Sequence, residues 1–300
     1  MIAPNVFIGV AGWSHPDWQD LLIPSFAPQT TSPLSALSRL FDLIEITTSY
    51  YHPPDAKTVQ HWLEQTRDNS RLHFTVRVWQ KLVREKSLSW KTDAATVQRG
   101  LLPLLQAQRL AALVLPFSPS FRHTDSNEEW LWRLRDAFAG WPLVVELLHD
   151  SWQQSALLPR LPSLNIAVAV VDQPQREEKM PAPDFDSNRR AYWRLNGRNR
   201  LKWLDQNADR DERFDYFYSA EEMAQLATIV RSMSNKAQSC YIVFHNHPRG
   251  QALANALQLF FALTGQKIDV PKNLCRHFPE LEALAAGPAA QQVEMFSERN

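Results

Sequence analysis

Eight short apolar runs, each ending in polar or charged residues, constrain the fold of this chain more than any other feature. The runs are Val6–Trp13, Leu43–Tyr50, Arg71–Trp79, Leu110–Phe117, Pro142–His149, Leu164–Asp172, Arg190–Gly197 and Ser239–His247. Stretches with helical periodicity separate most of them. A strand–helix unit repeated eight times is the number that closes a parallel barrel. The sequence therefore predicts an α/β fold, a single TIM-like (β/α)8 barrel.

The gaps between the runs agree with this prediction. Helices are expected at Ala56–Asp68, Ala94–Gln108, Glu128–Phe138, Ala220–Met233 and Gln251–Leu263. Residues 172–189 have no clean period and predict a long loop. We expect one domain over residues 1–300, with the barrel in 1–265 and a C-terminal extension, 266–300, packed on it, including a helical turn at Leu281–Ala285. A doubly wound open sheet is the alternative, but no glycine-rich phosphate loop follows the first run.

Composition limits the partners and the compartment. Lys+Arg and Asp+Glu each total 32, so the net charge is zero and no global basic field attracts nucleic acid or an anionic membrane. No apolar stretch approaches the length of a membrane span, and Met1–Val6 lacks the pattern of a signal peptide. The two cysteines, Cys240 and Cys275, form no disulfide framework and no metal-type spacing. We therefore expect a cytoplasmic protein.

Alternation of side chains along the runs assigns one face of each strand to the barrel interior. In the third run, Thr75 and Arg77 share a face, while Phe74 and Val76 make the other. An unpaired carboxylate facing the helix layer would be costly, so acidic residues within the runs are placed inward. The predicted inward set is Glu45, Arg77, Glu146, Asp172, Arg194, Asn196, His245 and His247, with Arg198 just beyond the seventh run.

At these residues the chain resembles the domain-of-unknown-function 72 (YecE-like) family along nearly its whole length. Several separate motifs in the same order carry the resemblance: Ile8–Ser14, Ile44–Ile46, Ser49–Tyr51, Val145–Glu146, His149–Trp152, Tyr192–Arg200, Tyr216–Ser219 and Phe244–His247. The resemblance implies a TIM-like barrel, in agreement with the strand count. The name of the family assigns no activity.

The chain departs from the family pattern at four places. Asn196 stands where the family typically has histidine, and His245 where it typically has asparagine. Arg77 replaces a usual lysine, and Leu147–Leu148 occupy the stretch where an arginine is common. If those groups act chemically, the departures imply a shifted or weakened activity. The exchange at Asn196 and His245 is also compatible with one ring moved across the same cavity.

Glu45 and Glu146 are the candidate catalytic residues. Two inward carboxylates on separate strands can divide the roles of proton donor and of nucleophile or base. The alternative is a buried ion-pair network, in which Glu45 pairs with Arg77 and Glu146 with Arg194 or His247. Such a network would hold the charges without performing chemistry, and the sequence leaves both interpretations open.

The remaining candidates are substrate-binding residues. Arg77, Arg194 and Arg198 form a predicted clamp for a phosphate or carboxylate, or else they neutralise the carboxylates. Trp13 and Trp152 are predicted as walls of the pocket, with loop packing as the alternative. Hydrogen-bonding roles are assigned to Asp172, Asn196, Asn246, His245 and His247. The i, i+2 histidines are compatible with a metal, but we expect hydrogen-bonded mouth residues and no metal site.

The lead hypothesis is a hydrolase or lyase that acts on a small polar, anionic or sugar-like substrate at the C-terminal mouth of the barrel. The alternatives are non-catalytic binding of a phosphorylated ligand and metal-assisted processing of nucleic acid, the latter an analogy from the fold alone. The basic segment Arg189–Arg213 carries acidic residues that offset much of its charge, so nucleic acid is not the expected partner. We expect no cofactor, and the oligomeric state stays open.

Overall fold

Eight parallel strands close into a barrel in the computed structural model, which describes residues 3–23, 32–153, 155–174 and 190–286. Each strand pairs with the next one in sequence, and β8 returns to pair with β1. The strands are β1 (Val6–Ala11), β2 (Leu43–Ile46), β3 (His73–Arg77), β4 (Leu110–Pro116), β5 (Leu143–Glu146), β6 (Ala167–Asp172), β7 (Arg190–Leu195) and β8 (Ser239–Phe244). The predicted barrel is confirmed. Several strands end earlier than the apolar runs, as at Thr48–Tyr50, where the chain makes a 3-10 turn right after β2.

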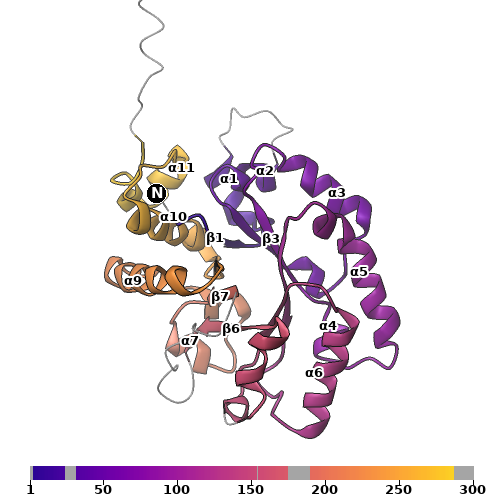
Figure 1. Cartoon of the computed structure of the whole chain (residues 1–300). Helices are drawn as coiled ribbons and strands as arrows, with labels where there is room; N and C mark the ends of the chain where they lie inside the picture. Colours follow the sequence, from indigo (N-terminus) through magenta and orange to yellow (C-terminus); the bar gives the residue numbers. More distant parts are fainter. Residues whose placement is uncertain (1–2, 24–31, 154, 175–189, 287–300) are drawn as a thin grey trace, which may run out of the picture.

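Helices surround the strands, and the five predicted ones are confirmed with shifted ends (Figure 1). The helices are α1 (Gln19–Leu22), α2 (Pro33–Ser38), α3 (Ala56–Gln65), α4 (Gln80–Val83), α5 (Trp90–Gln106), α6 (Asp125–Ala137), α7 (Arg200–Leu204), α8 (Arg210–Phe214), α9 (Ala220–Lys236), α10 (Gln251–Thr264) and α11 (Lys272–His277). Capping side chains fix where a helix begins. At the start of α9, for example, Ser219 forms a reciprocal capping box with Glu222.

Two connections differ from the regular pattern. Between β5 and β6 the chain makes three 3-10 turns, at Asp150–Trp152, Leu158–Arg160 and Pro162–Leu164. The turns Leu158–Arg160 and Pro162–Leu164 each have a proline at their first or second position, where a helical turn tolerates it. These short turns stand where a longer helix would otherwise connect the two strands. Most of the predicted long loop after β6, residues 175–189, lies outside the described residues.

Two apolar layers follow from the alternation of side chains along the strands. Val10, Phe74 and Leu195 face the helices and belong to the large outer core. Leu43, Val144, Ala169, Val171, Tyr192 and Val243 belong to a second cluster that fills the barrel interior. The interior is a packed core, as in other barrels of this type.

The described part of the C-terminal extension packs on the barrel's helices. Leu274 of α11 and Leu281 are fully buried, and α11 lies beside α1. Ile268 and Ala285 form an isolated β-bridge. The turn expected at Leu281–Ala285 begins earlier, as a 3-10 turn at Pro279–Leu281, and residues 287–300 lie outside the described part. None of the helices given above combines the length and apolar character needed to cross a membrane.

We expect Gly9→Ala to destabilise the barrel strongly. A β-carbon at Gly9 would lie 1.6 Å from the carbonyl oxygen of Leu43 on β2, so the two strands would have to separate. The cost should reach at least the upper end of the about 1–3 kcal/mol typical of overpacking. Gly140→Ala is the comparison: its added β-carbon meets nothing within 4 Å, so it should cost only the about 1 kcal/mol of placing alanine at a φ of +83°. Urea denaturation would measure both, and equal losses would contradict this account.

Candidate active site

The last inward-facing layer of the barrel is charged, and it lies at the carboxyl-terminal ends of the strands. The layer consists of Glu45 on β2, Arg77 on β3, Glu146 on β5, Arg194 on β7 and His245 directly after β8. Glu45, Glu146 and Arg194 are each 5% exposed or less, and His245 is 1% exposed. Below this layer the interior is mainly apolar. The strand pattern therefore predicted correctly that these side chains meet.

Arg194 is shared between the two carboxylates. One guanidinium nitrogen, Nη1, donates to Oε2 of Glu146, and the other, Nη2, lies 3.6 Å from Oε1 of Glu45. Burial opposes the charge of Arg194, but the two carboxylates outweigh burial and raise its pKa above the usual range. The network expected from the sequence exists, with Arg194 rather than Arg77 as the direct partner of Glu45.

Glu45 is held as a carboxylate by two hydrogen-bond donors and an ion pair with Arg194. Burial alone would raise its pKa, but His245 and Arg194 lower the pKa well below the usual carboxyl range. The hydroxyl of Tyr192 donates to Oε2, and Nε2 of His245 lies 2.7 Å from Oε1. A carboxylate with this many donors is a poor proton donor at neutral pH.

His245 is neutral in this arrangement. Its Nδ1 lies 3.5 Å from Nη2 of Arg194, which is a donor, so Nδ1 is the acceptor and Nε2 carries the hydrogen given to Glu45. Burial and the charge of Arg194 lower the pKa of His245 to about 3. Burial and Glu45 raise the pKa of Tyr192. Sequence reasoning placed Tyr192 on the inner face but did not identify it as a partner of Glu45.

Arg77 differs from the other members of this charged layer in its contacts. Its guanidinium lies over the ring of Tyr50, 4.7 Å from the ring centre. Its Nε is buried, and no described residue accepts a hydrogen bond from it. Burial and the like charge of Arg194 lower the pKa of Arg77, partly offset by Glu45 and Glu146. Within the described residues, the layer thus contains a half-buried cation whose buried Nε has no acceptor.

Asp172 and Arg198 differ from the prediction. Asp172 follows Val171, whose side chain faces the interior, so Asp172 turns to the outer side of β6. Nε of Arg198 lies 3.0 Å from both carboxylate oxygens of Asp172, and Nη1 lies 2.7 Å from Glu222 of α9. The pair joins the end of β6 to the start of α9 instead of pointing at the charged layer.

His247 belongs to a separate cluster. Its Nε2 lies 2.9 Å from Oδ1 of Asp211, and its Nδ1 lies 3.0 Å from the carbonyl oxygen of His245. The ring stacks on His15, with ring centres 4.4 Å apart. His15 and Asp211 were not identified from the sequence. His15 lies in the turn after β1, and Asp211 lies in α8, a short helix that the sequence did not predict.

The geometry does not favour a metal bound by His245 and His247. Nδ1 of His245 faces the cationic Arg194, and Nε2 is used by Glu45. Both nitrogens of His247 already face oxygen atoms. The described part of the chain holds no group of three or more His, Cys, Asp or Glu that could bind a metal ion.

The two asparagines make different contacts. Nδ2 of Asn196 donates to Oε1 of Gln173 (2.8 Å), and its Oδ1 is buried with no partner among the described residues. Asn196 is in phase with Arg194 but contacts no described residue of the charged layer. Nδ2 of Asn246 donates to the carbonyl oxygen of Tyr216 and to Oδ1 of Asn255, so Asn246 ties loops together.

The predicted tryptophan walls are packing residues in the structure. Trp152 is 1% exposed, stacks on Phe121 with ring centres 5.4 Å apart, and donates its indole hydrogen to the Phe121 carbonyl. The ring of Trp13 lies edge-on against Trp62 of α3, with ring centres 5.2 Å apart. The alternative of loop packing describes both better.

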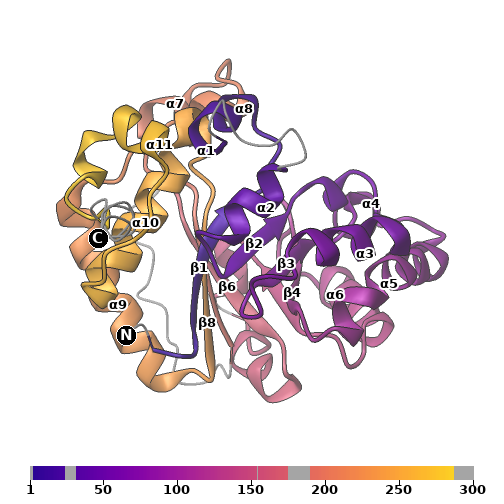
Figure 2. The same cartoon turned by 90° about the horizontal axis from the view of Figure 1, so that it is seen from above.

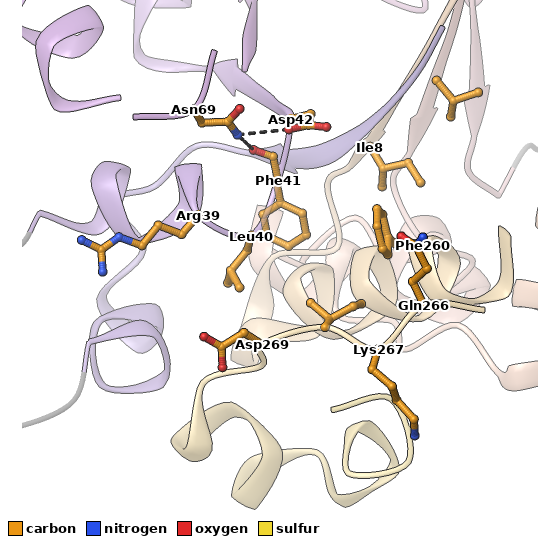
Figure 3. A pocket seen from close by; sticks show the side chains of 12 residues that line it. Ile8, Arg39, Leu40, Phe41, Asp42, Asn69, Phe260, Gln266, Lys267 and Asp269 are labelled. Atoms are coloured by element: carbon orange, nitrogen blue, oxygen red, sulfur yellow. Dashed lines mark hydrogen bonds between the residues drawn. The ribbon is translucent and has the colours of Figure 1, made fainter. Parts of the chain in front are cut away.

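A cavity of about 320 Å³ lies away from this layer, near the amino-terminal ends of β1 and β2 (Figure 3). Figure 2 shows this end of β1, marked N, opposite the end where α7 and α8 lie. Phe41 and Phe260 contribute apolar walls, while Asn69 is held by Asp42 at 3.0 Å. In barrel enzymes this end serves stability, so we do not assign the chemistry to this cavity.

We expect Arg194→Met to cost about 3–5 kcal/mol of unfolding free energy, because two buried carboxylates would lose their shared partner. Arg249→Met is the matched control: Arg249 pairs with Asp215 at the surface, with a side chain 64% exposed. Such a pair is worth only about 0–1 kcal/mol. Chemical denaturation of both variants tests this, and a small loss for Arg194→Met would mean that the network is not needed for folding.

Stability should fall as the pH decreases below about 6.5, the ordinary pKa of histidine. Burial and His247 lower the pKa of His15 to about 4, and that of His245 is about 3. As the pH falls, the histidines of the unfolded chain therefore take up protons before those of the folded protein. For each histidine, this lowers the free energy of unfolding by up to about 1.4 kcal/mol per pH unit. Below about 4.5 the lowered pKa of Glu45 adds to the loss. Urea denaturation across pH 4–7 should show a flatter slope for His15→Gln, and an unchanged slope would contradict this assignment.

Comparisons with known proteins agree with the fold. A family model described as "Protein of unknown function DUF72" matches residues 7–277. The UPF0759 protein YecE of Escherichia coli K12 is 36% identical over 69 residues, which cover 23% of this chain and only 22% of YecE. A solved DUF72 family protein of Thermotoga maritima is 29% identical, with a TM-score of 0.73 over 86% of this chain and 98% of that one. One of Enterococcus faecalis shares the fold at 24% identity, with a TM-score of 0.75 over 86% of this chain and 95% of that one. The chain therefore belongs to the DUF72 family.

Proposed function

We propose that the charged layer is the active site of a hydrolase or lyase that acts on a small polar substrate with an anionic group. Arg77 would bind the anionic group, and Glu146 would exchange a proton with the substrate. Glu45 would be a positioning residue, because Tyr192, His245 and Arg194 together hold it ionised. The site lies where α/β barrels carry their chemistry, at the carboxyl-terminal ends of the strands.

The single observation that carries the proposal is that Arg77, unlike Arg194, has no carboxylate partner among the described residues and keeps a buried Nε without an acceptor. Its Nε is buried and has no acceptor among the described residues. A buried donor without a partner costs about 1–3 kcal/mol, so a site that keeps one is expected to have a use for it. A carboxylate or phosphate would supply acceptors in the planar geometry that guanidinium matches. The ring of Tyr50 would hold the guanidinium in place from one side.

Glu146 fits the proton-transfer role better than Glu45. Only its Oε2 accepts from Arg194, and no described residue donates to Oε1. Oε1 is therefore the carboxylate oxygen available to a ligand in this layer. A carboxylate placed beside a bound substrate can act as general base or acid, an effect commonly worth about 10²–10⁴ in rate.

Non-catalytic binding of a phosphorylated ligand is the second candidate. The same Arg77 site supports it, and the well-satisfied contacts of Glu45 resemble a structural network more than reacting groups. The two candidates agree on where an anion binds, and they differ only in whether a product forms.

The test combines binding and turnover. Titration with sodium glycolate and sodium sulfate, followed by calorimetry, should show binding that Arg77→Met weakens at least tenfold. Arg39→Met is the control, since it removes an exposed arginine beside the amino-terminal cavity. A panel of sugar acids, sugar phosphates and glycosides, followed by NMR, should contain at least one converted compound. Glu146→Gln should keep binding but slow turnover about 10²-fold or more.

Each result decides between the candidates. Binding that depends on Arg77 with no product in any incubation would favour the non-catalytic candidate. Equal binding by wild type and Arg77→Met would overturn both, because the anion would then bind elsewhere. Thermal unfolding of each variant checks that a loss is not a failure to fold.

A further inference from the structure

The charged side chains of this layer balance one another before any ligand binds. Glu45 and Glu146 are two negative charges, and Arg77 and Arg194 are two positive ones, while His245 is neutral by its contacts. An anion bound to Arg77 would therefore leave one negative charge uncompensated. Uncompensated charge at a buried site is costly, and a titratable group commonly neutralises instead.

Glu146 is the group that can take a proton at least cost. Glu45 accepts from Tyr192 and His245 and lies beside Arg194, so its protonation would waste three favourable contacts. Glu146 has one such contact, with Arg194. Arg77, which also stabilises the Glu146 carboxylate, would be engaged by the ligand.

On the neighbouring strands β4 and β6 and on α4, the described side chains are already paired with other groups or carry no charge. On β6, Asp172 is paired with Arg198, which also serves Glu222 of α9. On β4, the residue paired with Glu146 is Pro116, which carries no charge. Lys81 of α4 lies over the ring of Trp79, with Nζ 4.5 Å from the ring centre.

We infer that the ligand's anionic group is a monoanionic carboxylate and that Glu146 takes up one proton when it binds. This inference rests on the function proposed above and names the class of its substrate. With one proton added, the bound state pairs the ligand with Arg77 and Glu45 with Arg194, and Glu146 is neutral. A dianion such as a phosphate monoester or sulfate would leave a further negative charge in the layer.

The proton gives the site a chemical function that the free protein lacks. Protonated Glu146 is a general acid next to the bound substrate, as a hydrolysis or elimination requires for its leaving group. In the free protein the same residue is the partner of Arg194. The acid would thus form only in the complex, from solvent protons, and only with a ligand of the right charge.

Calorimetry of the wild-type protein with sodium glycolate tests this directly. Titrations at pH 6.5 in bis-Tris and in imidazole, two cationic buffers with different heats of ionisation, give the number of protons exchanged. We expect uptake of close to one proton per glycolate bound. The dissociation constant should rise about tenfold from pH 6 to pH 7, where glycolate itself stays ionised. Sodium sulfate should bind more weakly than glycolate.

Glu146→Gln supplies the matched variant, because its neutral amide resembles the protonated acid. It should bind glycolate with no proton uptake and with a dissociation constant independent of pH. Glu129→Gln, at an exposed position of α6, should behave as wild type. The wild-type proton count needs no variant, so misfolding of Glu146→Gln would not remove the test.

The outcomes separate this inference from the proposed function. Glycolate binding that depends on Arg77 without proton uptake would overturn the inference and leave the proposed function standing. Tighter binding of sulfate than of glycolate would overturn the substrate class alone. Failure of both anions to bind in an Arg77-dependent way would overturn the inference and the proposed function together.

Discussion

A single guanidinium shared by two buried carboxylates is the interaction on which the mouth of this barrel depends. Arg194 of β7 contacts Glu146 of β5 and lies 3.6 Å from Glu45 of β2. Each carboxylate alone in this apolar interior would be driven towards its neutral form. With Arg194 between them, both can stay ionised, and His245 and Tyr192 can hydrogen-bond to Glu45 in fixed orientations. The charged layer is therefore preorganised by one side chain that is itself unavailable to a ligand.

That arrangement explains why Arg77 is the ligand-binding candidate. Both carboxylates face Arg194, so Arg77 is left with the aromatic ring of Tyr50 and a buried Nε without a partner. Two arginines from the same layer thus have different roles: one satisfies the protein's own acids, and the other is available for an acid from outside. Such a division cannot be read from residue types, because both are inward arginines at the ends of strands.

The sequence predicted the barrel and most of this layer because strand alternation is a strict rule. Glu45, Glu146 and Arg194 are in phase with residues of the inner cluster on their own strands. Arg77 is in phase with Thr75 and alternates with Phe74 and Val76, which belong to the outer core. The rule was misapplied at Asp172, which is out of phase with the inward Val171. It carries no information beyond the strands, where His247 and Trp152 are placed by turns. Partners such as Asp211 could not be found, because α8 is too short to give a periodic signal and its contact with His247 joins segments that are distant in the sequence.

A crystal structure of the wild-type protein soaked with sodium glycolate would test the central claim most directly. The account predicts the glycolate carboxylate bound side-on to the guanidinium of Arg77, beside Oε1 of Glu146, with Arg194 unmoved between Glu45 and Glu146. A glycolate bound elsewhere, or an Arg77 turned away to pair with a carboxylate of the protein itself, would contradict it.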